Sequence, residues 1–126
     1  MKIGVIGSNS INDNLLTFSN INKFIKSISS TISPVILGGG GKGVAQFTKE
    51  YCNEYNLDFV EFQPYSFLDK SVDFSNKYFF IRTKQIVDNS DRLLFITNGD
   101  CKEVNYGIKY CQKVNKPYFV SVIPKK

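Results

Sequence analysis

The sequence predicts an α/β protein with one Rossmann-like domain of three layers: a mostly parallel sheet of about five strands with helices on both faces. Short apolar runs alternate with helical patterns along the whole chain, and such alternation requires crossover connections between parallel strands. Apolar residues are continuous in KIGVIG, PVILG, RLLFI and YFVSVI, as expected for strands that are buried on both sides. The length of 126 residues fits a single domain, residues 1–126.

Each expected element follows from its local pattern. In order, they are the strand Lys2–Ser8, the helix Ser19–Ser30, the strand Pro34–Gly39, the helix Lys42–Asn56, the strand Leu57–Pro64, the helix Lys77–Ser90, the strand Arg92–Gly99, the helix Lys102–Asn115 and the strand Pro117–Ile123. The strands are rich in β-branched and aromatic residues, and Gly, Pro or Asn bounds them. The helices repeat apolar residues at helical spacing, as Ile21, Phe24 and Ile28 do. Ser19 or Asn20 is the expected N-cap of the first helix.

Composition excludes several kinds of chemistry. The chain has no histidine, so His-based triads and the commonest transition-metal ligand are absent. Cys52, Cys101 and Cys111 are too widely spaced for a Cys-x-x-Cys metal pair. We therefore expect no metal and no cofactor. Cys52 and Cys111 are expected in the core, whereas Cys101 lies in a polar loop.

Net charge and hydropathy give expectations for the kind of ligand and for the cellular location. The net charge of +5 suits phosphate-bearing ligands, although a Lys-rich surface alone would produce the same value. The first apolar run is too short for a signal peptide, and no run approaches the roughly 20 residues of a membrane span. We expect a cytoplasmic protein that does not associate with membranes.

The candidate site lies at the carboxyl ends of the strands, where parallel sheets bind ligands. GSNSIND, GGGGKG, QPYSFLDK and TNGDCKE emerge at that edge. The expected ligand-binding residues are Gly7, Ser8, Asn9, Gly38, Gly39, Gly40, Gly41, Lys42, Gly43, Arg82, Asn98, Gly99, Asp100 and Lys102.

The glycine run is the strongest signal in this set. Glycine backbones can approach a phosphate closely, and a helix N-terminus favours negative charge. Gly38, Gly40 and Gly43 satisfy the pattern G-x-G-x-x-G. However, the run follows the second strand rather than the first, which disfavours a dinucleotide fingerprint. GKGV also lacks the Ser or Thr of a Walker A loop. Tight helix packing is the competing explanation for the glycines.

Three separated motifs resemble one family. ILGGGGKG, the helix segment IRTKQIVDNSD and the loop TNG look like the SLOG superfamily, the Rossmann-like relatives of LOG phosphoribohydrolases and DprA-type proteins. The similarity is to its small YspA-type branch. The resemblance implies binding of a nucleotide or nucleotide-derived ligand, with Arg82 as a phosphate or ribose partner. Within these segments, Ser90–Asp91 match the family's helix-ending Ala-Asp, and Asn98–Gly99 match the Asp-Gly of its last loop.

The chain departs from the family at its catalytic loop. LOG-type enzymes carry PGGxGTxxE, whose glutamate assists glycosidic cleavage, and Asn105 stands near that position here. Glu103 lies two residues earlier, on a different side of the expected helix. Ala45 replaces the family's aspartate after the glycine turn. These departures disfavour hydrolysis.

The preferred interpretation is therefore a module that binds a signalling nucleotide, such as a cyclic ADP-ribose variant. It would act as a sensor in an anti-phage defence system or as a phage-type sponge. The alternative is a nucleoside or nucleotide N-glycosidase, or a deoxyribosyltransferase, that uses Glu103 or Asp100. Single-stranded DNA binding is a less favoured third interpretation. The resemblance and the aromatic residues also favour a homo-oligomer.

Overall fold

The computed structural model describes residues 1–8, 10–28, 33–39, 43–62, 77–99 and 101–123, with residues 77–79 described by backbone alone. The described strands are β1 (Lys2–Gly7), β2 (Val35–Gly39), β3 (Asp58–Phe62), β4 (Arg92–Thr97) and β5 (Tyr118–Val122). The described helices are α1 (Asn14–Ser27), α2 (Val44–Glu54), α3 (Lys77–Asn89) and α4 (Lys102–Val114). Strands and helices alternate as the sequence predicts.

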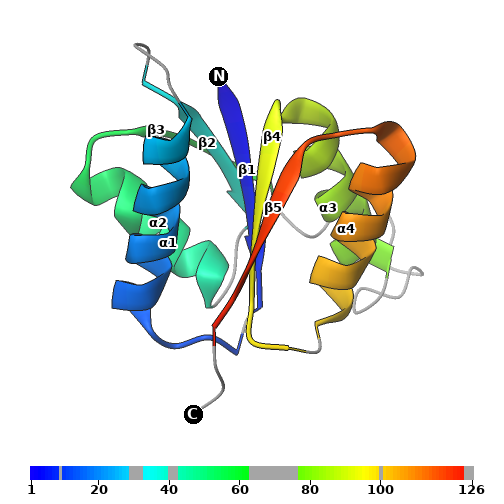
Figure 1. Ribbon diagram of the computed structural model, residues 1–126, viewed down its shortest axis with the longest axis horizontal. Helices are drawn as coiled ribbons and strands as arrows, with labels where there is room; N and C mark the ends of the chain where they lie inside the picture. The colour runs from blue at the N-terminus through cyan, green and yellow to red at the C-terminus, as the bar shows by residue number, and fades with distance from the viewer. Residues whose placement is uncertain (9, 29–32, 40–42, 63–76, 100, 124–126) are drawn as a thin grey trace.

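The five strands form one parallel sheet in the order β3-β2-β1-β4-β5 (Figure 1). β1 is central and pairs with both β2 and β4, so the strand order reverses beside it. The predicted Rossmann-like α/β fold is therefore confirmed.

Two apolar layers hold the helices onto the sheet. Figure 1 shows α1 and α2 on one face and α3 and α4 on the other. Ile3, Val5 and Leu94 point toward the first pair, together with Cys52 of α2. The second layer contains these buried residues: Ile6, Leu37, Ile86, Val87, Leu93, Phe95, Val104 and Cys111. Cys52 and Cys111 are thus core residues, as expected.

The first helix begins earlier than the sequence predicts. α1 starts at Asn14, and the carboxylate of Asp13 accepts a hydrogen bond from the Leu16 N–H at 3.0 Å. Asp13 is therefore the N-cap, and the expected cap at Ser19 or Asn20 was wrong. A carboxylate at this position satisfies an N–H of the first turn, which has no partner within the helix.

None of the helices in the described ranges combines the length and the apolar character that a bilayer crossing requires.

Candidate functional site

The carboxyl ends of β1, β2 and β4 meet at one edge of the sheet, at the bottom of Figure 1. α2 and α4 begin at this edge, because each follows one of these strands. In an open α/β sheet the ligand crevice lies where the strand order reverses, and here that point is between β1 and β4. We call this region the carboxyl edge.

Side-chain and backbone hydrogen bonds join the ends of β1 and β4. The Ser8 hydroxyl donates to the Thr97 hydroxyl oxygen at 3.2 Å, and the Ser8 N–H donates to the Ile96 carbonyl at 3.0 Å. Farther out, the Asn98 amide donates to the Ser10 hydroxyl oxygen at 2.9 Å. The two strand ends are therefore fixed relative to each other before any ligand binds.

Gly7 lets α2 approach the end of β1. A Cβ atom on Gly7 would lie 2.5 Å from the Ile96 carbonyl oxygen and 2.6 Å from the Val44 side chain. The Val44 N–H donates to the Ser8 carbonyl at 3.3 Å. Gly43 caps α2 with φ 70° and ψ −134° and contributes no side-chain hydrogen bond, a conformation that L side chains rarely adopt. The N-terminus of α2 is consequently held against the ends of β1 and β4.

An ion pair lies beside the end of β2. The Arg82 guanidinium donates to Glu103 Oε1 at 2.7 Å, and the Thr83 hydroxyl donates to the same oxygen at 3.1 Å. The exposed fractions of the two charged side chains are only 6% and 18%. Arg82 on α3 is thus linked to the first turn of α4. Both side chains are largely shielded from solvent, which strengthens a charge-assisted hydrogen bond.

The guanidinium also packs on the glycine run. A Cβ atom on Gly39 would lie 2.8 Å from Arg82 Cζ and Nε. Gly39 therefore gives Arg82 the room to reach Glu103. Gly38 is buried against the ring of Phe59, with an added Cβ 3.0 Å away, so part of the glycine run serves packing.

The structure brings most of the predicted site residues to the carboxyl edge. The predicted residues that it places there are Gly7, Ser8, Gly38, Gly39, Gly43, Arg82, Asn98, Gly99 and Lys102. Five others lie outside the described residues: Asn9, Gly40, Gly41, Lys42 and Asp100. The segment QPYSFLDK, residues 63–70, also lies outside them.

Thr97 was not among the predicted site residues, and no partner was predicted for Glu103. Thr97 is buried and accepts hydrogen bonds from Ser8 and from the Gly99 N–H. The available signal was a polar residue ending an otherwise apolar strand. Glu103 faces Arg82 and Thr83, whereas Asn105 is exposed. Only the packing of α3 against α4 reveals that pairing.

The cysteines differ in their surroundings. Burial raises the pKa of the Cys52 thiol to about 12 and that of Cys111 to about 11. Both thiols are therefore poor nucleophiles near neutral pH. Cys101 is partly exposed and is the N-cap residue of α4, without a side-chain capping bond. Within the described ranges, no group of three His, Cys, Asp or Glu residues could hold a metal ion.

Compared by sequence, the chain matches no protein-family model and no curated protein. Compared by structure, it is similar to DNA processing protein A from Helicobacter pylori, whose structure is described for its unique single-stranded DNA binding mode. The TM-score is 0.69 and the sequence identity 16%. The match covers 100% of this chain and 66% of that chain, slightly less than two thirds. The likeness is one of fold, and it agrees with the fold that the sequence resemblance implies.

Proposed function

We propose that the carboxyl edge binds a nucleotide or a nucleotide-derived signalling molecule, in the manner of a small stand-alone SLOG module. The observation that carries the proposal is Gly39 packed under the Arg82–Glu103 ion pair. This contact ties the end of β2 to α3 and α4 at the point where the glycine run begins. A fixed backbone beside a helix N-terminus is a suitable setting for a phosphate group.

Arg82 has a positioning role in this proposal. Its positive charge is balanced by Glu103 at 2.7 Å, so it adds little net attraction for an anion. The phosphate is instead met by the N-terminus of α2, which lacks a side-chain cap, and by the exposed Lys102 at the start of α4. Asn98 and Ser10 at the rim supply hydrogen-bonding groups for a ribose or a base.

A thermal-shift experiment with AMP, ADP-ribose and cyclic di-AMP tests the proposal. A ligand at 100 times its dissociation constant stabilises the folded state by about 2.7 kcal/mol, which raises the melting temperature measurably. We expect at least one of the three to do so. If none shifts the melting temperature at millimolar concentration, the proposal fails.

The Asn98→Asp variant tests whether the ligand binds at the carboxyl edge. The new carboxylate can accept a hydrogen bond from Ser10, so the fold is kept, but its charge repels a phosphate. We expect ligand affinity to fall about tenfold. Asn53→Asp is the matched control, because it adds the same charge on an exposed position near the far end of α2. Equal losses in both variants would argue against this location.

Glu103 supports a second candidate, an N-glycosidase. Both side-chain hydrogen bonds that it accepts within the described residues end on Oε1. The carboxylate is thus held by one oxygen, and Oε2 can contact a substrate as general base or nucleophile. Chromatographic detection of free base from AMP tests this activity. We then expect Glu103→Gln to abolish release while AMP still binds; absence of release by the native protein rules the candidate out.

Single-stranded DNA is a further ligand to include in the panel, since the structural neighbour is described as binding it. Binding to a DNA backbone would weaken steeply as salt rises. A mononucleotide held by a few hydrogen bonds would depend on salt much less. The salt series therefore distinguishes the two kinds of ligand.

A further inference from the structure

We propose that a groove between α1 and β5 is a second binding site, for a planar aromatic anion such as a nucleobase with its attached phosphate. The groove is separate from the carboxyl edge. Arg92 and Pro117 lie at or just before the amino ends of β4 and β5, and Ser27 ends α1, which runs antiparallel to the strands. This inference goes beyond the proposed function, and either site can exist without the other.

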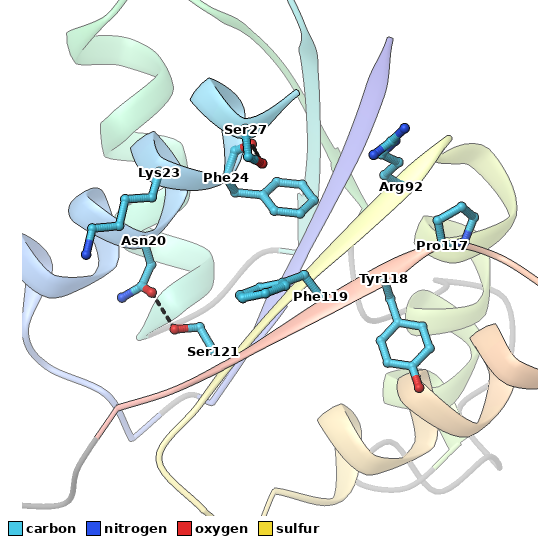
Figure 2. A pocket seen from close by; sticks show the side chains of 9 residues that line it. All are labelled: Asn20, Lys23, Phe24, Ser27, Arg92, Pro117, Tyr118, Phe119 and Ser121. Carbon is cyan, nitrogen blue, oxygen red and sulfur yellow. Dashed lines mark hydrogen bonds between the residues drawn. The ribbon is translucent and has the colours of Figure 1, made fainter. Parts of the chain in front are cut away.

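The groove has the size of a small-molecule site. Its volume is about 510 Å³, and sites for compounds of nucleotide size occupy roughly 300–1,000 Å³. It is lined by Asn20, Lys23, Phe24, Ser27, Arg92, Pro117, Tyr118, Phe119 and Ser121 (Figure 2).

Two phenyl rings form its apolar part. Figure 2 shows the rings of Phe24 of α1 and Phe119 of β5 next to each other in the groove. Their centroids are 6.3 Å apart and their planes are inclined by 39°. Phe119 stays 58% exposed on the edge strand β5, so much of the residue is accessible to a ligand. Proteins commonly hold a nucleobase by stacking it on an aromatic ring, an interaction that does not depend on which base is bound.

The charged residues of the groove are both cations. Lys23 lies at the α1 rim and Arg92 at the β4 rim, and none of the lining residues is Asp or Glu. Within the described ranges neither cation forms a salt bridge. A guanidinium offers paired donors that match a phosphate. The groove thus combines uncompensated positive charge with exposed aromatic surface.

A hydrogen bond joins β5 to α1 at the end of the groove that lies away from Arg92. The Ser121 hydroxyl donates to the Asn20 amide oxygen, linking β5 to α1 (Figure 2). The Tyr118 ring points to the other face of the sheet, where it packs on Phe95 and its hydroxyl accepts from Gln112. Tyr118 therefore lines the groove without placing its ring in it, and Phe119 is left as the stacking surface.

Titration of the ¹⁵N-labelled protein with AMP tests the site. We expect the backbone amides of Phe24 and Phe119 to shift with saturable dependence on AMP. Adenosine lacks the phosphate and ribose 5-phosphate lacks the ring, so each should bind at least about fivefold more weakly. If neither amide moves at millimolar AMP, the site does not exist, whatever happens at Asn98 and Gly99.

Two variants test whether the Phe119 ring and the Arg92 charge each contribute to AMP binding in the groove. Phe119→Ala and Arg92→Gln should each weaken AMP binding at the groove about fivefold to tenfold. Val122→Ala is the control for the ring, because Val122 is 67% exposed on β5 but alternates to the other face. Lys109→Gln is the control for the charge, on exposed surface of α4. Unchanged affinity in both groove variants would overturn the proposal.

Two further measurements show whether the ligand is a free nucleotide or part of a DNA strand, and whether a second copy of the chain covers the groove. A single-stranded oligodeoxyadenylate that shifts the same amides, with affinity that falls steeply with salt, identifies a base within a strand; a salt-tolerant response to AMP alone identifies a free nucleotide. Light scattering tests whether a second copy covers the groove. A dimer that Phe119→Ala converts to monomer would make the groove a subunit interface and overturn the ligand proposal.

Discussion

The carboxyl edge and the α1–β5 groove satisfy their polar groups in opposite ways. At the carboxyl edge Ser8 bonds to Thr97, and the buried Arg82 bonds to Glu103. In the groove Arg92 and Lys23 have no salt-bridge partner within the described residues, and Phe119 is largely exposed. The buried polar groups of the carboxyl edge are therefore bonded to one another within the folded protein, and the two cations of the groove are not paired in this way. Substitutions of buried residues at the carboxyl edge should lower stability, whereas substitutions in the groove should leave stability nearly unchanged.

The largest effect is expected from Gly7→Ala. The new methyl group would lie 2.5 Å from the Ile96 carbonyl oxygen, a backbone atom that cannot move aside. We expect the free energy of unfolding to fall by about 3 kcal/mol, measured by urea denaturation. Ser10→Ala, at the exposed rim of the same edge, should change it by less than about 0.5 kcal/mol. A stable Gly7→Ala protein would mean that α2 does not pack on β1 as described.

Breaking the buried ion pair should have the next largest effect. Arg82→Met leaves Glu103 partly buried without its positive partner, so we expect a loss of about 2 kcal/mol, discounted for the 18% exposure of Glu103. Lys49 and Glu61 form a pair at 3.2 Å in which the Lys49 side chain is 65% exposed, and Lys49→Met should change stability by less than about 0.5 kcal/mol. Equal losses would remove the claim that Arg82–Glu103 organises the site.

Alkaline pH should lower the free energy of unfolding, because Cys52 and Cys111 are buried in the two core layers. Burial raises the pKa of Cys52 to about 12 and that of Cys111 to about 11, from an ordinary value of 9.0. Between these values the unfolded chain releases thiol protons that the folded chain keeps, so the free energy of unfolding falls as pH rises above about 9. Each thiol contributes at most about 1.4 kcal/mol per pH unit, less the effect of solvent screening.

Urea denaturation at several alkaline pH values measures this effect. Cys52→Ala should reduce the dependence on pH even though it lowers stability overall. A variant with the same alkaline slope as the native protein would contradict the assignment to Cys52.

The smallest effect on stability is expected from Phe119→Ala. Phe119 is already 58% exposed, so removal of its ring should change the free energy of unfolding by about 0.5 kcal/mol or less. The same variant should weaken AMP binding in the groove. A loss of stability as large as that of Arg82→Met would show that Phe119 serves the core, and the contrast between the two regions would disappear.

The fold could be read from the sequence because its signals are local. Apolar strands such as Arg92–Thr97 and the helical spacing of Ile21 and Phe24 determine their own elements. The start of α1 was misplaced because Asp13, at the end of the polar segment GSNSIND, caps the helix. The capping bond depends on backbone geometry that residue spacing does not contain.

The candidate site was predictable only in part. The edge to which Gly39, Arg82 and Asn98 belong follows from topology, since the carboxyl ends of parallel strands lie together. The ion pair of Arg82 with Glu103 joins residues on different helices, so only the packing of α3 on α4 reveals it. The groove joins α1 to β5, which lie at opposite ends of the chain, and no motif links them.

Nucleotide binding at the carboxyl edge can be measured by ¹⁵N-detected titrations with AMP, ADP-ribose and cyclic di-AMP. We expect at least one of these ligands to cause saturable shifts at the amides of Gly7, Ser8, Asn98 and Gly99. Asn98→Asp should weaken this binding, and Phe119→Ala should leave it unchanged. Spectra in which these four amides stay in place at millimolar concentrations of all three ligands would contradict nucleotide binding at this edge.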